Sequence, residues 1–301
     1  MALFSTLASL SQTAASNAAD GSVDAPATID NQLNLLASFI AQLRDANGFT
    51  TGIGYTAQCR LVKSGSNLVL QRYNGAGLTI NGVTYSIPSG GVSLAPTSLT
   101  PGTTYYIYAY MNAGTMTLEA STTTHATDTT TGIEIKSGDA TRTLVGMARP
   151  ITGPAWQDVI NQRFVISWFN RRPIQCQAGL GSTTTTTSGT PVELATSLRN
   201  EFLAWADSSS SFTFDGYASN NTFAASVVTT MAIDGTLVDG YCAFTNNVAN
   251  QIGPLSVTGI ATVSEGYHYA TPFVNVSSGT GTWIGSIAAG SRCSLKGLIQ
   301  G

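Results

Sequence analysis

Short apolar runs separated by small polar residues recur along most of the chain, and this pattern predicts β-strands. Apolar and polar positions alternate in residues 83–87 (VTYSI), and aromatic and apolar residues fill most of 103–111 (TTYYIYAYM). Alternation with a period of two places one set of side chains in a core and the other in solvent. Asn81-Gly82 precedes 83–87 and favours a type I′ hairpin, whose two central residues both need positive φ.

Residues 48–172 form the first strand-rich segment. Strands are expected at 68–70, 78–80, 83–87, 103–111, 116–119, 132–135, 143–147 and 164–169. Short strands at this spacing, separated by turn residues, are typical of a small antiparallel β-sandwich. The polar stretch 170–173 (NRRP) marks the end of this predicted spacer domain.

Residues 173–301 form the second strand-rich segment. Strands are expected at 202–205, 212–215, 222–224, 225–233, 240–246, 253–263, 267–276, 282–287 and 293–299, and the Ser/Thr run 182–188 fits an edge strand or a loop. Short strands at intervals of about ten residues are typical of a jelly-roll sandwich. The sequence therefore predicts a mainly β fold, in which a short N-terminal helix precedes two antiparallel β-sandwich domains, the last a jelly roll.

Only residues 1–47 carry a helical pattern. Apolar residues recur there at spacings of 4, 3, 4 and 3, as in the a and d positions of a heptad repeat: Ile29, Leu33, Leu36, Ile40 and Leu43. Pro26 precedes this stripe and Asn47-Gly48 follows it, which are typical start and stop signals. About two heptads fit either one amphipathic helix on its own core or a short bundle of several chains. We favour the bundle, because nothing nearby in the sequence covers the stripe.

The scarcity of charge supports the β class. Charged residues make up 10% of the chain, against about 25% in a typical globular domain. Soluble helices carry charged outer faces, whereas strands present Thr and Ser outward. Residues 1–172 hold 10 Lys/Arg against 9 Asp/Glu, and residues 173–301 hold 3 against 7. Because the sequence has no basic stripe, nucleic acid is not an expected partner.

Metal or cofactor chemistry has no support in the sequence. The four cysteines are far apart and the two histidines are not near them in sequence: Cys59, Cys176, Cys242, Cys293, His125 and His268. Zinc sites need clustered Cys or His ligands, so no metal and no cofactor are expected, and the cysteines are predicted to be free buried thiols.

The N-terminal sequence and the lengths of the apolar runs indicate where the protein is made and whether it enters a membrane. The chain has no Lys or Arg before residue 44, so it lacks the charged start of a secretory signal. Its apolar runs are all shorter than the roughly 18 residues that a membrane span needs. We expect a protein that is made in a cytoplasm and is not inserted into a membrane.

Two stretches resemble parts of known fibre proteins. Residues 20–30 (DGSVDAPATID) and 36–45 (LASFIAQLRD) resemble the N-terminal region of tailed-bacteriophage fibre proteins. Residues 255–260, 264–269, 279–283 and 294–299 look like the last strands of trimeric jelly rolls of the complement-C1q and tumour-necrosis-factor type, which also cap phage fibres. The chain departs from a long fibre, because it has no collagen-like or extended coiled-coil shaft between these ends.

The resemblance implies a homotrimeric virion protein. Residues 1–47 would be an extended segment and a helix that trimerises through its apolar stripe and attaches to another virion protein. The C-terminal jelly roll would then be a tip that contacts a glycan or a protein of the host surface. The sequence leaves open whether such a fibre hangs from a tail or decorates a capsid, where its role would be structural.

Binding residues are expected in exposed loops, because loops on a rigid scaffold carry recognition groups. The candidates are an aromatic residue and asparagines that follow predicted strands of the last domain: Tyr217, Asn220, Asn221, Asn246 and Asn247.

Catalytic signatures are weak. His125 lies in a Thr-rich run typical of a surface loop, and His268 lies in a predicted strand, exposed or at a subunit contact. The GxGxxA match at 52–57 has no βαβ context. A polysaccharide depolymerase would need two carboxylates flanking the scissile bond. No pair stands out among Asp128, Glu134, Asp139, Asp207, Asp215, Asp234, Asp239 and Glu265. We therefore do not expect an enzyme.

Overall fold

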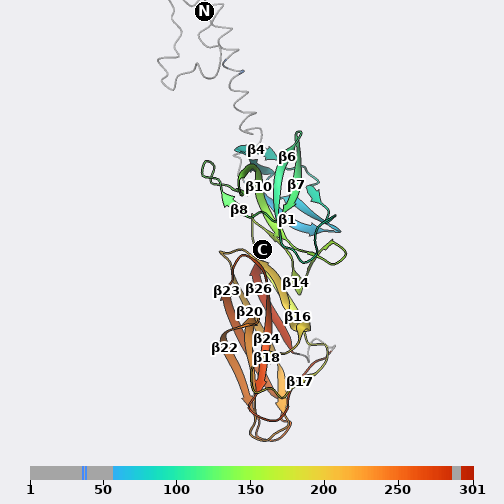
Figure 1. The fold of residues 1–301 in the computed structure, drawn as a ribbon, viewed down its shortest axis with the longest axis vertical. Coiled ribbons are helices and arrows are strands. Elements are labelled where there is room, and N and C mark those ends of the chain that lie inside the picture. The colour runs from blue at the N-terminus through green and yellow to red at the C-terminus, as the bar shows by residue number, and fades with distance from the viewer. Residues whose placement is uncertain (1–35, 37, 39–56, 287–292) are drawn as a thin grey trace, which may run out of the picture.

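The computed structural model describes residues 36, 38, 57–286 and 293–301, and nearly all of its regular structure is β-strand. Figure 1 shows two strand-rich bodies along the long axis, one built from β1 to β12 together with β15 and the other mainly from β16 to β26. Both consist of facing antiparallel sheets. The predicted mainly β class is thus confirmed.

The first body, called the middle sandwich, has a three-stranded sheet, a hairpin and a six-stranded sheet. The three-stranded sheet contains β1 (Cys59–Ser64), β2 (Asn67–Arg72) and β5 (Val92–Leu94), and the hairpin contains β3 (Gly77–Ile80) and β4 (Val83–Ser86). The six-stranded sheet has β7 (Thr115–Ser121), β6 (Tyr105–Asn112), β10 (Asp139–Ala148), β9 (Glu134–Lys136) and β8 (His125–Thr127) in that order, with β15 (Val165–Ser167) also paired to β10.

The turn between β3 and β4 follows the sequence expectation. Asn81 and Gly82 have φ values of 50° and 74°, as a type I′ turn requires. Strand β6 alternates between two cores. Tyr105, Ile107 and Ala109 are buried against the three-stranded sheet, whereas Tyr108 is buried in a cluster shared with the second body. The six-stranded sheet is therefore covered on both faces.

Four two-residue strands connect the bodies. β11 (Pro150–Ile151) pairs with β12 (Ala155–Trp156), and β13 (Asp158–Val159) pairs with β14 (Gln162–Arg163). β14 then runs parallel to β19 (Asn200–Ala204), so this hairpin extends a sheet of the second body.

The second body, called the C-terminal sandwich, has a seven-stranded and a six-stranded sheet. In the seven-stranded sheet β19 is followed by β24 (Gly266–Val276), β21 (Ser226–Ile233) and β22 (Thr236–Thr245), and β18 (Val192–Glu193) pairs with β24. The six-stranded sheet has β16 (Pro173–Gly179), β26 (Ser294–Gln300), β20 (Ser209–Asn220), β25 (Gly281–Trp283) and β17 (Thr184–Thr186), with β23 (Gly253–Thr262) on β20.

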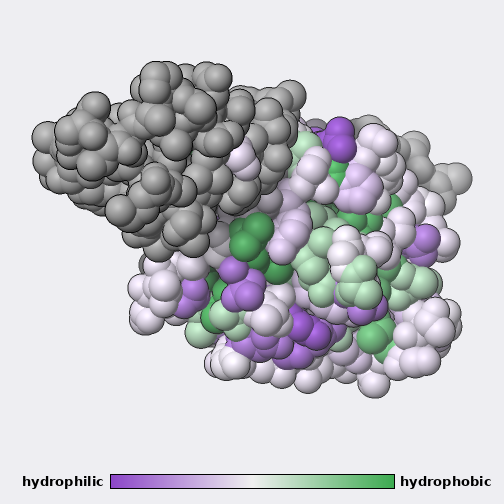
Figure 2. Space-filling view, turned by 90° about the horizontal axis from the view of Figure 1, so that it is seen from above, coloured by the Kyte–Doolittle hydropathy of each residue, from purple (hydrophilic) through white to green (hydrophobic). Residues whose placement is uncertain are grey.

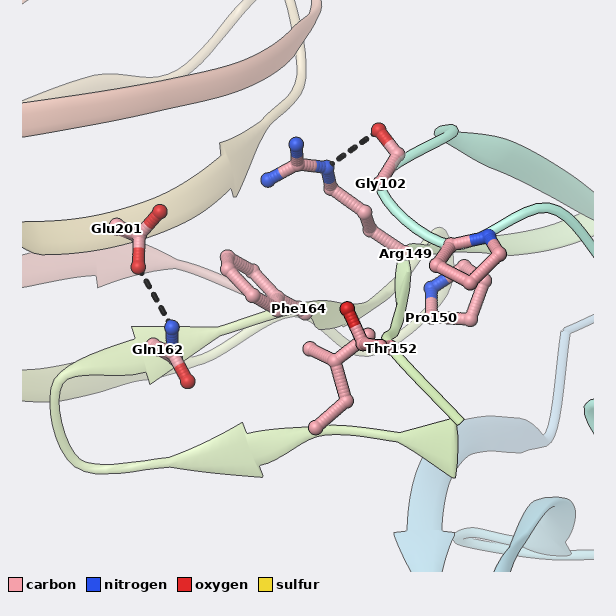
Figure 3. Close-up of a pocket in the computed structure, with 9 residues that line it drawn as sticks. Gly102, Arg149, Pro150, Thr152, Gln162, Phe164 and Glu201 are labelled. Atoms are coloured by element: carbon pink, nitrogen blue, oxygen red, sulfur yellow. Dashed lines mark hydrogen bonds between the residues drawn. The ribbon is translucent and has the colours of Figure 1, made fainter. Parts of the chain in front are cut away.

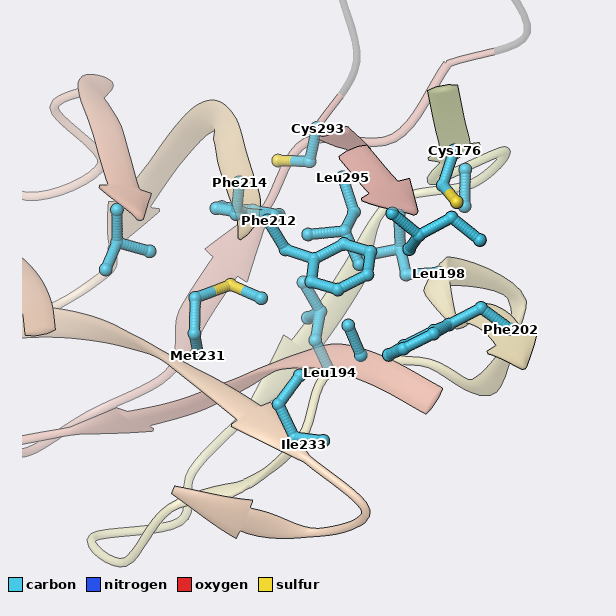
Figure 4. Packing of buried hydrophobic residues seen from close by; sticks show 14 of the residues in the cluster. Cys176, Leu194, Leu198, Phe202, Phe212, Phe214, Met231, Ile233, Cys293 and Leu295 are labelled. Carbon is cyan, nitrogen blue, oxygen red and sulfur yellow. The ribbon is translucent and has the colours of Figure 1, made fainter. Parts of the chain in front are cut away.

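Aromatic and aliphatic side chains from both sheets fill the space between them, as Figure 4 shows for Phe202, Phe212 and Phe214. The Ser/Thr run 182–188 supplies the edge strand β17, one of the two structures expected for it. The expected strand at 222–224 is instead a turn, because Ala224 has a φ of 57°, which no strand accommodates.

The C-terminus lies between the two sandwiches (Figure 1). Gly301 is buried, its N–H donates to the carbonyl of Arg172 at 3.0 Å, and the N–H of Arg172 donates back to Gly301 at 2.7 Å. The expected strand that anchors the terminus is thus confirmed as β26.

Most of the predicted N-terminal helix lies outside the described residues. Ile29, Leu33, Ile40 and Leu43 fall there, whereas Leu36 is described as helical and exposed. Its trimerisation role stays a prediction. In the part of the chain that the structure describes, no helix is long and apolar enough to cross a membrane.

Candidate functional site

The end of the C-terminal sandwich farthest from the middle sandwich carries three neighbouring loops, which we call the distal loops: residues 221–225, 246–252 and 277–280. They connect β20 to β21, β22 to β23 and β24 to β25, and they lie at the lower end of Figure 1. Because antiparallel strands return at the same edge, sequence-distant loops meet here.

Asn246 fastens two of the distal loops together. Its Oδ1 accepts the N–H of Ala225 at 3.0 Å, and its Nδ2 donates to the carbonyls of Asn220 and Val248, both at 2.9 Å. Only 1% of Asn246 is exposed. A buried amide with its polar atoms engaged fixes loop geometry, since breaking the bonds would leave unpaired polar groups.

Asn220 and Asn221 hold the third distal loop. The Nδ2 of Asn220 donates to the carbonyl of Ser278 at 2.9 Å, and Oδ1 of Asn221 accepts the N–H of Thr280 at 2.8 Å. The carbonyl of Asn220 also accepts the N–H of Asn250 at 2.7 Å. Gly279 is required between them, since a Cβ there would lie 2.8 Å from Asn220 Oδ1 and its φ is +68°.

Three large apolar side chains stand out from this rigid frame. Phe223 is 70% exposed, Val248 is 61% exposed and Ile252 is 58% exposed. All three belong to the two loops that Asn246 joins, so they sit on a common frame. Large exposed apolar side chains on ordered loops are candidates for contact with another molecule. We call Phe223, Val248 and Ile252 the distal apolar set.

The backbone at Ala224 is strained. Its φ of 57° lies in the left-handed region that costs an alanine about 1 kcal/mol or more. The N–H of Ala224 donates to the carbonyl of Asn246 at 3.2 Å. This bond holds the turn that projects Phe223 into solvent.

The candidate ligand-binding residues divide into two groups. The expected exposure is wrong for Asn220 and Asn246, which are buried because their amides hydrogen-bond the backbone of neighbouring loops. Asn221 and Asn247 are exposed in the distal loops, and Asn221 also holds one of these loops. Tyr217 is 47% exposed and lies within β20, apart from the loops, where its carbonyl accepts the N–H of Ile284 at 3.0 Å. Sequence reasoning missed the distal apolar set, whose available signal was apolar residues inside polar, Asn-rich turns.

A cluster of polar side chains around His125 lies between the two sandwiches. His125 Nδ1 is 2.5 Å from Glu134 Oε2, and His125 Nε2 is 3.2 Å from both carboxylate oxygens of Glu265. The hydroxyl of Tyr106 donates to Glu265 at 2.7 Å, and the ring of His125 lies 5.4 Å from that of Trp168. The surface-loop expectation for His125 is wrong, because the residue starts strand β8, which pairs with β9.

The carboxylates set the charge of this imidazole. Burial by itself would lower the pKa of His125, but hydrogen bonds to Glu134 and Glu265, with their negative charges, outweigh it and raise the pKa above its ordinary value. Burial, helped by the hydrogen bond to Glu265, raises the pKa of the Tyr106 hydroxyl, which stays protonated.

The other histidine is also engaged. His268 lies in β24 as expected, but it is buried and not exposed, with Nδ1 2.6 Å from Asp234 Oδ2 and Nε2 2.8 Å from the carbonyl of Ser264. Among the described residues, no group of three or more His, Cys, Asp or Glu side chains is placed to hold a metal ion.

The surface at the opposite end from the distal loops is mixed. Seen from above, its described part shows small green areas interspersed with white and purple ones (Figure 2).

Comparison with known proteins does not identify a family. No protein-family model and no curated protein matches the sequence. The insecticidal delta-endotoxin Cry8Ea1 from Bacillus thuringiensis is similar with a TM-score of 0.28 and 10% identity, over 87% of this chain and 55% of that one. Dimeric latent PorU from Porphyromonas gingivalis has a TM-score of 0.28 and 9% identity, over 86% and 23%. Infectious bursal disease virus, Gx strain, has a TM-score of 0.21 and 13% identity, over 86% and 84%.

The chain thus spans about half of the endotoxin and about a quarter of PorU. TM-scores of this size carry no argument about function.

Proposed function

We propose that the chain is a structural virion fibre protein, a phage tail fibre, that attaches to the host cell surface as a homotrimer. The observation that carries this proposal is the distal apolar set, Phe223, Val248 and Ile252, exposed on loops that buried asparagines hold rigid. Preordered loops lose little conformational entropy on binding, so a small apolar surface can contribute affinity.

The arrangement of the two sandwiches supports the same proposal. Gly301 lies at the junction between them, and the distal loops lie at the opposite end of the C-terminal sandwich. The middle sandwich then acts as a spacer, and residues 1–47 trimerise and bind another virion protein. Three equivalent sets on one trimer add avidity, because weak contacts act together.

Adsorption of the full chain to cells tests the proposal. Fluorescently labelled protein is mixed with a panel of bacterial strains, and a strain that binds it is used to compare variants. A triple variant, Phe223→Ser, Val248→Ser and Ile252→Ser, should lose at least about tenfold in cell binding, since each side chain loses apolar contact area.

A matched triple variant serves as the control. Val83, Val159 and Ile160 are also exposed, but Val83 lies in the β3–β4 hairpin and Val159 and Ile160 lie in the β13–β14 hairpin, outside the distal loops. Their replacement by Ser should leave adsorption unchanged. Equal losses in both variants, or binding to no strain, would contradict attachment through the distal loops. Light scattering of the full chain should give three times the mass of one chain, and a monomer would contradict the trimer.

A further inference from the structure

A cavity of about 430 Å³ opens between the two sandwiches, away from the distal loops. Its walls come from the loop at Pro101-Gly102, from residues 149–152, from β14 with Phe164, and from Glu201 of β19 (Figure 3). The volume lies in the range of small-ligand pockets, which favour domain junctions. We call this the junction pocket.

The polar side chains of the junction pocket are held in place before any ligand arrives. Gln162 and Glu201 are neighbours across β14 and β19, and Gln162 Nε2 donates to Glu201 Oε2 at 2.6 Å (Figure 3). Glu201 Oε1 accepts the hydroxyl of Tyr267 at 2.5 Å. Burial and the hydrogen bond to Glu201 raise the pKa of Tyr267 to about 12, so it remains a donor.

Arg149 is fixed on the other wall. Its guanidinium lies 3.7 Å from the ring centroid of Tyr267, and its Nε donates to the carbonyl of Gly102 at 2.8 Å. Both terminal amino groups extend beyond that bond (Figure 3), and the guanidinium also forms a hydrogen bond with the Tyr267 hydroxyl, so only part of its donors remain for a ligand. In the described parts of the chain, no carboxylate forms an ion pair with Arg149 within 4.0 Å.

The two opposite charges of the lining disfavour a ligand that carries a single charge. Arg149 and Glu201 are the only charged residues among the described lining, and their charges are opposite. An anion would meet the carboxylate and a cation would meet the guanidinium. A carboxylate offers about four acceptor sites, and two of those of Glu201 are used, so acceptors and donors both remain. The hydroxyl groups of a ligand can bond to both the acceptors and the donors of the pocket, because each hydroxyl donates one hydrogen bond and accepts others.

We propose that the junction pocket binds a neutral sugar residue. Its hydroxyls would accept from Arg149 and donate to Glu201, while Pro101, Pro150 and Ile151 offer apolar contact to its C–H face. The junction pocket is separate from the distal apolar set. A test of sugar binding in this pocket is therefore independent of the test of attachment through the distal loops.

Saturation-transfer-difference NMR of the full chain tests the pocket. The probes are methyl α-glucoside, methyl β-galactoside, methyl α-mannoside and N-acetylglucosamine, with glucosamine and N-acetylneuraminic acid as charged counterparts. At least one neutral probe should bind in the millimolar range and at least about tenfold more tightly than both charged ones. No binding of any neutral probe at about 50 mM, or equal binding of a charged one, would overturn the proposal.

Two variants locate the binding. Thr152 is exposed at the pocket, so Thr152→Trp should fill it and weaken binding at least about tenfold, whereas Thr129→Trp in an exposed turn of the middle sandwich should not. Gln162→Met removes the side-chain amide from the pocket wall, and with it the hydrogen bond that this amide donates to Glu201. We expect the loss of the amide to outweigh the freed acceptor of Glu201, so this variant should also weaken sugar binding. Equal affinity in Thr152→Trp and Thr129→Trp would overturn the assignment to this pocket.

Discussion

His125 Nε2 lies 3.2 Å from both carboxylate oxygens of Glu265, and this pair joins the middle sandwich to the C-terminal sandwich. Glu134 holds the other ring nitrogen at 2.5 Å. An imidazole that faces a carboxylate at each nitrogen is satisfied when both nitrogens carry protons. The junction therefore favours the imidazolium form, which the raised pKa of His125 reflects.

The stabilisation from His125 should depend on pH. Because its pKa in the folded chain is raised above the ordinary 6.5, the contribution is fully present below pH 6.5 and is lost as pH rises through the folded pKa. His125→Gln should lower the free energy of unfolding by about 2 kcal/mol at about pH 6, and by less at about pH 9. Urea unfolding followed by tryptophan fluorescence measures this, since Trp168 and Trp205 pack beside the ring.

A double-mutant cycle with Glu265→Gln separates this pair from other effects of the substitution. The coupling energy between the two positions should shrink as pH rises. A loss in His125→Gln that is the same at every pH would contradict a charged imidazole at the junction.

The buried amide of Asn246 should contribute more to the free energy of unfolding than the exposed amide of Asn247. Asn246→Ala removes three hydrogen bonds between the distal loops, each contributing about 0.5–1.5 kcal/mol, so the free energy of unfolding should fall by about 2–4 kcal/mol. Asn247 is exposed, and Asn247→Ala should change it by less than about 0.5 kcal/mol. Thermal and urea unfolding compare the two. Equal effects would show that the asparagine network does not fix the distal loops.

Local patterns predicted the strands well because their causes are local. Asn81-Gly82 was enough for the β3–β4 hairpin, since the need for positive φ lies within the turn. Residues 103–111 were recognised as a strand, but the pattern did not show that both faces of β6 would be buried. The second covering layer comes from a separate sandwich, which no local period encodes.

The side-chain environments at the two sites depend on partners that are distant in the sequence, so local patterns did not predict them. His125 was expected in a loop because Thr-rich runs are typical of loops, while its partner Glu265 lies 140 residues away. The sequence predicts Asn220 and Asn246 in exposed binding loops, but both side chains are buried. Burial of Asn220 and Asn246 follows from how three loops pack together, so their structural role was not visible in the sequence.

Gly216 should not tolerate a side chain. A Cβ at this position of β20 would lie 2.4 Å from Cys293 Sγ and 2.9 Å from its Cα, so the strand or the backbone at Cys293 must move. Gly216→Ala should lower the free energy of unfolding by about 1–3 kcal/mol, a typical cost of overpacking. Gly181→Ala is the control, because a Cβ there meets nothing within 4 Å. Similar melting temperatures for both variants would contradict this packing.

The four cysteines should differ in reactivity. All are free thiols, and Cys59, Cys176 and Cys293 are buried whereas Cys242 is half-buried. Burial raises the pKa of Cys59 and of Cys176 to about 12, and it raises the pKa of Cys293. Because the thiolate is the reactive form, these three should resist a thiol reagent both by low thiolate content and by lack of access.

Titration with Ellman's reagent at about pH 8 should therefore modify about one thiol per native chain and all four after unfolding in guanidinium chloride. Cys242→Ser should abolish the native reaction and leave the three buried thiols for the unfolded one. Rapid reaction of any thiol in the native Cys242→Ser chain would mean that one of the cores around Cys59, Cys176 or Cys293 opens to solvent far more readily than its packing implies.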